Sequence, residues 1–283
     1  MSVISGNKGA VNGAAQIGNW SVTSTADLQA FVASGSKQGT VRSDGIKKWN
    51  GQYMGKETTP PVMPGVSFTF TGSFEGTNGA TGTAVVDQVE IVIDIETGTV
   101  IQYTTQFSAA GALTLGAAAA TDTTVPTPKT SVGRKVEINT TTGVTPVWSN
   151  ILNTKAITIT ITAANAKYSD SETSGEEWTL PGGNIDFQVS IPVNVEDDLA
   201  NLPAVNSFAE IRAYVNATTF WHLRWVKWGE QSDIRVDIDT NEMIGCTLNG
   251  SMSGSESWTD DGVPAAQVLG FIKNPAAATF WPV

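Results

Sequence analysis

Apolar and polar residues alternate along most of this chain with the two-residue period that is typical of β-strands. At 66–74, Val, Phe and Gly alternate with Ser and Thr, and at 89–95 every odd position is apolar while two even positions are acidic. Similar alternation at 156–162 and 186–193 predicts two further strands. We therefore expect a mainly β protein whose strands are half-buried and antiparallel.

A strand–turn–strand pattern occurs twice, 143 residues apart. Aligned without gaps, residues 82–111 and 225–254 are identical at nine of thirty positions and conservatively replaced at six more. Each copy contains an alternating strand, a short polar turn and a returning strand, which together predict a β-hairpin. The repetition predicts that the chain holds two copies of one β domain.

Composition along the chain suggests where these two domains begin and end. We expect a first β domain at 1–116 and a second at 133–254, both of the sandwich or barrel type. Residues 117–132 are rich in Ala, Thr and Pro, as is typical of a linker. Residues 255–283 contain several aromatic side chains, which we expect to dock on their own domain or on a neighbouring subunit.

Helix signals are confined to two short segments, one in each expected domain. The first covers 25–32. The second covers 206–215, where Ser207 is a suitable N-cap and Glu210 follows three residues later, as in a capping box. We therefore expect each β domain to carry one short helix.

Charge and cysteine content narrow the function further. The chain has 27 acidic and 16 basic residues and a formal net charge of −11. Affinity for nucleic acid comes from Lys and Arg that neutralise phosphates, so a chain this acidic is not expected to bind DNA or RNA tightly. No apolar run approaches the roughly 20 residues of a membrane-spanning helix, and we expect neither such a helix nor a signal peptide. The single Cys246 argues against an internal disulfide and a Cys-rich metal site, and we expect a small buried residue on a strand.

Candidate catalytic residues are few. His222 is the only histidine, and neither a Ser or Cys nucleophile motif nor a second histidine accompanies it. The acidic run at 196–198 lacks the ligand spacing of a calcium loop, and the Gly-rich segment 76–83 lacks the Lys of a phosphate loop. The tryptophans within 221–228 could stack on a sugar, but strand spacing favours packing in a core or interface. We expect neither enzymatic activity nor a cofactor.

Four short motifs follow one another in the first unit. They are a glycine-punctuated strand at 6–11, a Trp-Ser-Val strand with Ala-Asp at 17–27, a Trp-x-Gly-x-aromatic-x-Gly strand at 49–55 and a Gly-Ala-Leu element at 111–113. In this order and spacing, residues 1–116 resemble the tail tube proteins of long-tailed bacteriophages. In the second unit Trp148 stands in place of Trp20.

The second unit departs from these motifs in other ways. Residues 185–187 stand in place of the Trp49 strand, and Gly-Ser-Met-Ser-Gly at 250–254 replaces the Gly-Ala-Leu element. The second copy is therefore identified mainly through its hairpin.

The resemblance implies two tandem tail-tube-like β domains in a structural virion protein. Such proteins stack as rings whose inner strands form a channel, and DNA passes through the channel without specific binding. The implied partners are further copies of the chain, the tape-measure protein and the tail-terminator protein, and no membrane is involved. The implied location is the virion tail, with assembly in the host cytoplasm. If family rings use six single domains, three copies of this chain would complete a ring. The alternative is a hexamer whose second domains decorate the outside.

Two groups of residues are candidates for contacts in such a tube. Carboxylates that line a DNA channel would repel phosphate, and the repeated hairpins offer four of them. They are Asp94, Glu96, Asp237 and Asp239. The Pro-rich loop at 56–64 cannot pair in a sheet, so we expect it to contact the next ring. Its candidate residues are Lys56, Glu57, Pro60, Pro61 and Met63.

Two other classes of function remain open. One is a different phage structural component, such as a tail-terminator, tail-tip or head-decoration protein. The other is a carbohydrate-binding β-sandwich adhesin that uses exposed tryptophans.

Overall fold

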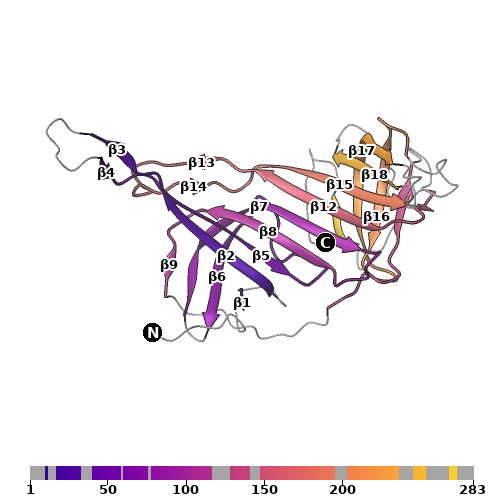
Figure 1. Cartoon of the computed structure of the whole chain (residues 1–283), viewed down its shortest axis with the longest axis horizontal. Helices are drawn as coiled ribbons and strands as arrows, with labels where there is room; N and C mark the ends of the chain where they lie inside the picture. The colour runs from indigo at the N-terminus through magenta and orange to yellow at the C-terminus, as the bar shows by residue number, and fades with distance from the viewer. Residues whose placement is uncertain are drawn as a thin grey trace.

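One sheet of 15 strands runs the length of the molecule, and almost all of its pairings are antiparallel (Figure 1). Within the described residues of this computed structural model there are strands and turns but no helix. The expectation of a mainly β protein with antiparallel strands is therefore confirmed. The structure describes residues 10–11, 17–32, 40–58, 60–75, 78–116, 128–140, 147–194, 203–235, 245–252 and 268–272.

The first half of the sheet is built around one long strand, β7. The C-terminal part of β7 lies in the main sheet beside β8, β5 and β2, in that order. Its N-terminal part runs into a second layer, where it pairs with β6 and β9 (Figure 1). The strands are β1 (Ala10–Val11), β2 (Ile17–Ala26), β5 (Lys47–Gly55), β6 (Ser67–Glu75), β7 (Asn78–Asp94), β8 (Gln102–Ala109) and β9 (Thr114–Leu115).

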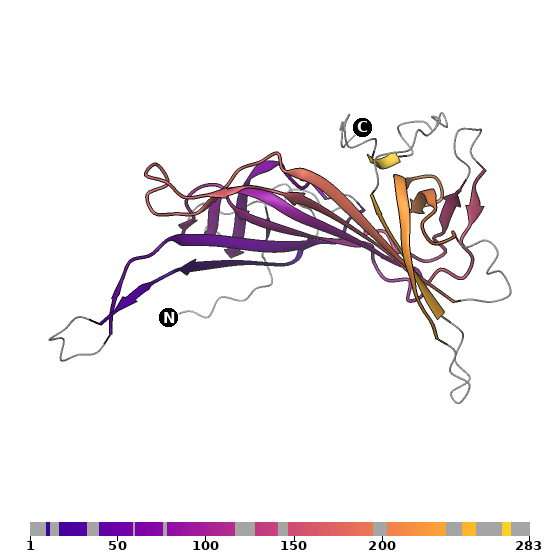
Figure 2. The same cartoon turned by 90° about the horizontal axis from the view of Figure 1, so that it is seen from above.

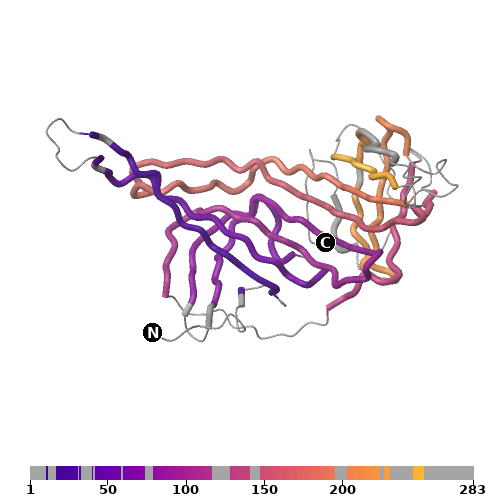
Figure 3. Tube along the Cα trace, viewed as in Figure 1, coloured from indigo at the N-terminus to yellow at the C-terminus, as the bar shows by residue number. Residues whose placement is uncertain are grey.

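The second half continues the same sheet without a break. Here the long strand is β17, which lies beside β18, β15 and β12, in that order, and also pairs with β16 and β19. In Figure 3 the trace of β12 lies beside that of β7, in agreement with their pairing. The strands are β10 (Val136–Asn139), β11 (Ser149–Asn150), β12 (Ala156–Ala164), β15 (Asn184–Asn194), β16 (Phe208–Tyr214), β17 (Phe220–Arg235), β18 (Gly245–Met252) and β19 (Val268–Ile272).

The strand order of the first half recurs in the second. The order β2-β5-β8-β7 is followed directly by β12-β15-β18-β17, and β6 pairs with β7 as β16 pairs with β17. The two halves meet where β7 and β12 pair antiparallel over seven residues, from Asp94↔Ala156 to Gln88↔Thr162. We call this contact the internal joint.

Two hairpins project from the same end of the sheet (Figure 2). They consist of β3 (Gln29–Phe31) with β4 (Val41–Ser43), and β13 (Lys167–Tyr168) with β14 (Trp178–Thr179). Each connects the first two strands of its half, so they occupy equivalent places in the strand order. The turn of the second hairpin contacts the base of the first, where Lys47 N donates to Gly175 O and Glu177 N donates to Lys47 O, both at 2.8 Å.

Alternation along each strand determines which face of the sheet is buried. In β7 the side chains of Val89, Ile91 and Ile93 are buried, whereas the intervening side chains are only half-buried. The buried face of the first half packs mostly aromatic rings, with the Phe70 and Phe107 centroids 4.9 Å apart. Burying a large apolar side chain contributes about 1.5–3 kcal/mol, so these rings account for much of the stability of this half.

The packing around Gly51 explains why the Trp-x-Gly-x-aromatic motif of β5 contains a glycine. A Cβ atom at this position would lie 2.5 Å from Phe107 Cζ and 2.5 Å from Ser21 O. Beside it, Trp49 Nε1 donates to Gly111 O at 2.7 Å. The glycine therefore lets the Phe107 ring lie across β5 while the neighbouring indole remains anchored.

Both expected helices are wrong. Residues 208–214 form β16, where a β-bulge between Ala209 and Ile211 shifts the register at Glu210. The extra residue of that bulge lies on β17, so β16 keeps its two-residue period, with Ala209, Ile211 and Ala213 buried. Glu210 and Tyr214 are buried on the other face, and a strand buried on both faces lacks the apolar–polar alternation of a half-buried strand. The segment 25–32 is divided between the end of β2 and β3, which form the base of a projecting hairpin.

Candidate functional site

The side chains opposite the core form one continuous polar face across both halves of the sheet. Cross-strand pairing aligns them in rows, and in the first half Ser21 lies opposite Gln52, which lies opposite Gln106. In the second half the corresponding row is Thr158, Ser190 and Asn249. Gln106 and Asn249 are also aligned in the sequence repeat, so Ser21 is the counterpart of Thr158.

Two open hollows on the polar face occupy equivalent positions in the two halves. One, of about 470 Å³, lies over β2, β5 and β8 with Asp87 of β7 at its edge, and the other, of about 340 Å³, lies over β12, β15 and β18 with Gly229 of β17 at its edge. Their lining residues match strand by strand, with hydroxyl and amide side chains at most positions. The matched pairs are Ser21 with Thr158, Thr23 with Thr160, Asn50 with Gln188, Gly51 with Val189, Gln52 with Ser190, Gln106 with Asn249, Phe107 with Gly250 and Ser108 with Ser251.

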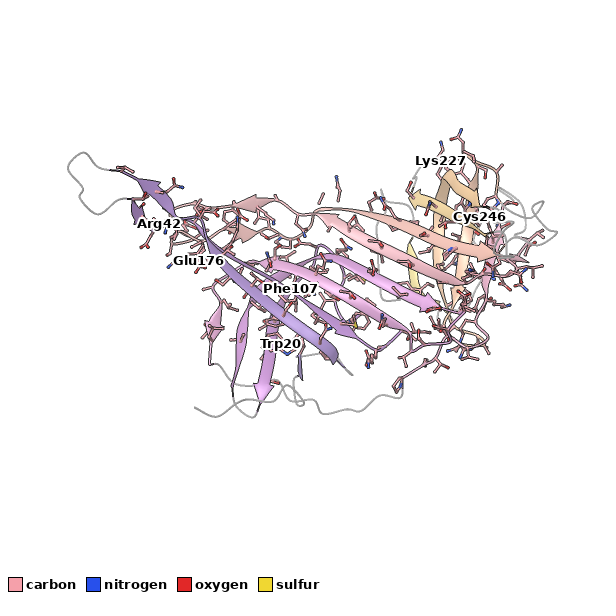
Figure 4. The ribbon with its side chains drawn as sticks, viewed as in Figure 1. Trp20, Arg42, Phe107, Glu176, Lys227 and Cys246 are labelled. Carbon is pink, nitrogen blue, oxygen red and sulfur yellow. The ribbon has the colours of Figure 1, made fainter. Side chains whose placement is uncertain are left out.

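Charged residues are sparse on the polar face. Among the side chains that the structure describes, its carboxylates are Asp87, Glu90, Asp94 and Asp186, and its ammonium groups belong to Lys48 and Lys227. Pairing with Gly245 gives Arg235 a position on this face as well. Lys48 Nζ lies 3.3 Å from Asp27 Oδ2, so its charge is partly balanced. Lys48 lies on β5 in the first half, whereas Lys227 lies on β17 in the second half, where Figure 4 labels it. A neutral surface with isolated carboxylates offers phosphate few favourable contacts.

Two of the four expected channel carboxylates lie at the end of the first hairpin. Asp94 accepts hydrogen bonds from Thr97 N at 3.1 Å and from Thr97 Oγ1 at 2.5 Å, so it holds the turn that follows β7. Glu96 is exposed, and its Oε1 lies 3.8 Å from Lys155 Nζ. Asp237 and Asp239 lie outside the described residues.

Sequence reasoning did not single out Asp87, Glu90 and Asp186 as candidates on this face. Glu90 is a polar position in an alternating strand, and Asp186 is the first residue of the strand predicted at 186–193. Asp87 could not be found by alternation, because the register of β7 against β8 shifts between Val86 and Gln88. Its carboxylate accepts a hydrogen bond from Ser108 Oγ.

The Pro-rich loop at 56–64 packs partly against the second half of the chain. Pro60 and Met63 are buried, whereas Lys56 and Pro61 are exposed and Glu57 is half-buried. Trp221 Nε1 on β17 donates to the carbonyl oxygen of Thr58 at 3.1 Å. The contact of this loop with another ring stays a prediction, and its exposed residues are the ones available for such a contact.

Side-chain contacts reinforce the internal joint. Asn165 Nδ2 donates to Asp87 Oδ1 and to Val86 O, both at 3.0 Å. At the other end, Ile95 N and Glu96 N both donate to Lys155 O at 2.8 Å. The joint therefore combines a β-ladder with hydrogen bonds at both of its ends, which fixes the register of one half against the other.

The layer behind the second half contains a buried polar cluster. Glu210 and His222 are fully buried, with His222 Nε2 3.9 Å from Glu210 Oε1. Asn139 Nδ2 donates to Glu210 Oε2 at 3.3 Å, and the Arg212 guanidinium lies 3.8 Å from the Trp148 ring centroid. These groups lie within the packing of β10, β16 and β17 and do not line either hollow.

Cys246 is a buried free thiol on β18, as expected, and burial raises its pKa. In the part of the chain that the structure describes, His, Cys, Asp and Glu form no group of three or more that could hold a metal ion. That same part holds no helix long and apolar enough to cross a membrane. The chain matches no known protein-family model and no curated protein.

Proposed function

We propose that this protein is the structural subunit of a phage-type tail tube, in which rings of the chain stack around a channel for DNA. The observation that carries this proposal is the edge-to-edge repetition of one strand order, β2-β5-β8-β7 followed by β12-β15-β18-β17. A chain made of two equivalent domains in one continuous sheet already contains one contact of the kind that a ring repeats. Repeating a heterologous contact closes a ring when the rotation between units allows it.

The polar face supports a channel lining. Its hydroxyl and amide side chains remain hydrated, while its isolated carboxylates disfavour contact with phosphate. In this proposal, the carboxylates that repel DNA most are not those expected from the sequence. Glu90 and Asp186 lie along the middle of the face, whereas Asp94 and Glu96 lie at its end, beside the turn.

Each ring contains three copies of the chain, so that six tandem domains surround the channel. A hexamer whose second domains decorate the outside is the competing arrangement. The internal joint supports the trimer, because it places the second half in the same sheet as the first, with the polar side chains of both on one face. A decorating domain would not need to continue that sheet.

The remaining contacts of the tube follow from the same assembly. The projecting hairpins and the exposed residues of the loop 56–64 are available for contact between stacked rings. The tape-measure and tail-terminator proteins are the proposed partners inside and at the end of the tube. The protein then acts in the virion tail, without a cofactor or a catalytic step.

Electron microscopy of the purified, concentrated protein tests this function directly. We expect long tubes, and class averages along the tube axis that show three chains and six similar domains per ring. Six chains per ring, with the second domains outside, would overturn the trimer. Isolated rings would favour a terminator, and monomers that bind an immobilised glycan array would favour an adhesin.

A further inference from the structure

Strand β2 presents a long edge that nothing in the described structure covers. No described strand pairs with it on the side away from β5. Its ten residues, Ile17–Ala26, include no charged residue and no proline, and its register against β5 shifts only at its start, between Ile17 and Asn19. Exposed edge strands are normally short or protected by charge, proline or a bulge, since a bare edge invites pairing with another chain. Because β2 lacks this protection, its composition suits a strand that pairs with another chain.

Strand β17 ends in a second open edge, and comparison with β7 shows what belongs there. On one side of β7, Val86 exchanges backbone hydrogen bonds with the chain just before β6, and β12 takes over from Gln88. On the same side of β17, Trp228 exchanges backbone hydrogen bonds with the chain just before β16. No described strand takes over at 229–235. The place that β12 fills beside β7 is therefore open beside β17.

The internal joint also supplies the register of the missing contact. Ser21 is the counterpart of Thr158, as the matching rows of the polar face show. Val92 pairs with Gln102 on β8, and Arg235 pairs with Gly245 on β18. In both cases the partner lies ten residues further along the chain, so Arg235 on β17 is the counterpart of Val92 on β7. Within the chain, Val92 lies opposite Thr158. The equivalent contact between copies brings Arg235 opposite Ser21.

We propose that β17 of one copy pairs antiparallel with β2 of the next, in the register that places Arg235 opposite Ser21. This intermolecular joint rests on the proposed ring and identifies the two surfaces that close it. Its partner is a second copy of the same chain, because the only template for the contact is the chain's own β7–β12 ladder.

The direction in which alternate N–H groups of β2 point predicts the geometry of the Ser21–Arg235 pair. Asp27 N donates to Ile46 O at 3.0 Å, so the odd residues of β2 direct their N–H groups towards β5. Even residues such as Val22 direct theirs to the open edge. Ser21 and Arg235 therefore form a non-hydrogen-bonded pair, whose Cα atoms are about 4.5 Å apart in antiparallel sheets. That separation lies within the range that a disulfide can span.

Cysteine cross-linking tests the register. In a Cys246→Ala background, the chain with Ser21→Cys and Arg235→Cys is assembled and mildly oxidised, and covalent oligomers are separated under denaturing conditions. We expect covalent dimers and trimers. The matched control combines Thr23→Cys with Arg235→Cys, which moves one thiol by two residues and separates the Cα atoms by about 8 Å, beyond the reach of a disulfide. We expect at least about tenfold less cross-linking in this control.

Microscopy of the same samples separates the register from the function. Tubes that cross-link through the Ser21 pair support both proposals. Tubes in which the Thr23 control cross-links as well or better, or in which neither pair reacts, overturn the register and leave the tube intact. Folded protein that forms neither oligomers nor cross-links overturns the joint and the tube together. Circular dichroism establishes that each variant is folded.

Discussion

The Asn165 side chain, from the second half of the chain, donates to the Asp87 carboxylate of the first half at 3.0 Å and to Val86 O at 3.0 Å, and its Oδ1 accepts from Gly183 N at 3.3 Å. This side chain therefore spans the internal joint where the register of β7 shifts. We predict that Asn165→Ala lowers the free energy of unfolding by about 1–3 kcal/mol, because it removes three hydrogen bonds from partly buried groups, two of them across the joint. Urea denaturation of wild type and variant measures the difference.

Asn150 provides a control for that substitution. It is exposed on β11, away from the joint, so Asn150→Ala should change stability by no more than about 0.5 kcal/mol. Equal effects of the two substitutions would mean that Asn165 does not hold the halves together.

The open edge of β2 predicts a proline substitution that blocks assembly and spares the subunit. The N–H of Ser24 points away from β5 by the parity set at Asp27, so Ser24→Pro removes a donor that only a second copy would use. We expect the variant to remain folded but to sediment as a monomer in analytical ultracentrifugation.

Thr23→Pro is the matched control. The N–H of Thr23 points towards β5, so its loss breaks a ladder hydrogen bond inside the subunit. We expect a lower melting temperature for this variant, whereas Ser24→Pro should melt close to wild type. Tubes that form normally with Ser24→Pro would rule out β2 as the pairing edge.

The close approach at Gly51 predicts a third effect. Gly51→Ala introduces a Cβ atom 2.5 Å from Phe107 Cζ and from a backbone oxygen, so the ring must move within a packed core. We expect a loss of about 1–3 kcal/mol, the usual cost of overpacking, measured by chemical denaturation. Gly111→Ala is the control, since its Cβ would lie no closer than 3.4 Å, from Thr83 Cβ. A stable Gly51→Ala protein would show that Phe107 can move freely.

The strands of this fold could be predicted from the sequence because alternation reports burial directly. The strand expected at 66–74 is β6, and those expected at 156–162 and 186–193 are β12 and β15. The pairing of β7 with β12 could not be predicted, since it joins two strands through backbone groups that every sequence provides. The same limit applies to the polar hollows, each of which is lined by residues from four separate strands.

Two features account for the other failures of sequence reasoning. Strand β16 is buried on both faces, so it lacks the alternation of a half-buried strand, and at Asp87 a bulge in β7 places a carboxylate on the polar face out of step with the alternation. Sequence repetition compensated in part, because the hairpin match supplied the counterpart of Gln106 in the second half. The register of the proposed intermolecular joint depends on that one alignment together with the observed ladders.

Burial of two tyrosines predicts a loss of stability at alkaline pH. Desolvation raises the pKa of Tyr53 to about 12, and desolvation, together with a hydrogen bond to Glu137, raises that of Tyr214 to about 12. The pKa of both is near 10 in an unfolded chain. Their contribution to stability is therefore complete below pH 10 and is lost as the pH rises from 10 to 12. Urea midpoints across that range should fall.

Tyr53→Phe separates this effect from general alkaline denaturation. The variant lacks the hydroxyl that must ionise, so its stability should decline less steeply between pH 10 and 12 than that of wild type. The quantity to compare is the slope of the urea midpoint against pH, because the substitution also removes a hydrogen-bonding group and shifts the absolute stability. Identical slopes would mean that Tyr53 does not control the transition.

The proposed channel predicts that reversing charge on the polar face creates affinity for DNA. Glu90 and Asp186 lie on this face on neighbouring parts of the sheet, and Glu90→Lys with Asp186→Lys changes the charge by +4 per chain. Assembled tubes of the double variant should retain a fluorescent single-stranded oligonucleotide at low salt. Retention should fall steeply as salt rises, since phosphate binding releases counterions. Wild-type tubes should retain none.

A charge-matched control distinguishes the channel from the outer surface. Glu172 and Asp170 lie in the turn between β13 and β14, away from the polar face, and both are exposed. Because this hairpin is available for contact between rings, electron microscopy first establishes that both variants assemble into tubes. Reversing them also changes the charge by +4 per chain. If DNA is retained only by the Glu90 and Asp186 variant, and is protected there from added nuclease, then the polar face lines an enclosed channel. Retention that is equal in both variants, or fully nuclease-sensitive, would place Glu90 and Asp186 on the outer wall, where their charge could not influence DNA in transit.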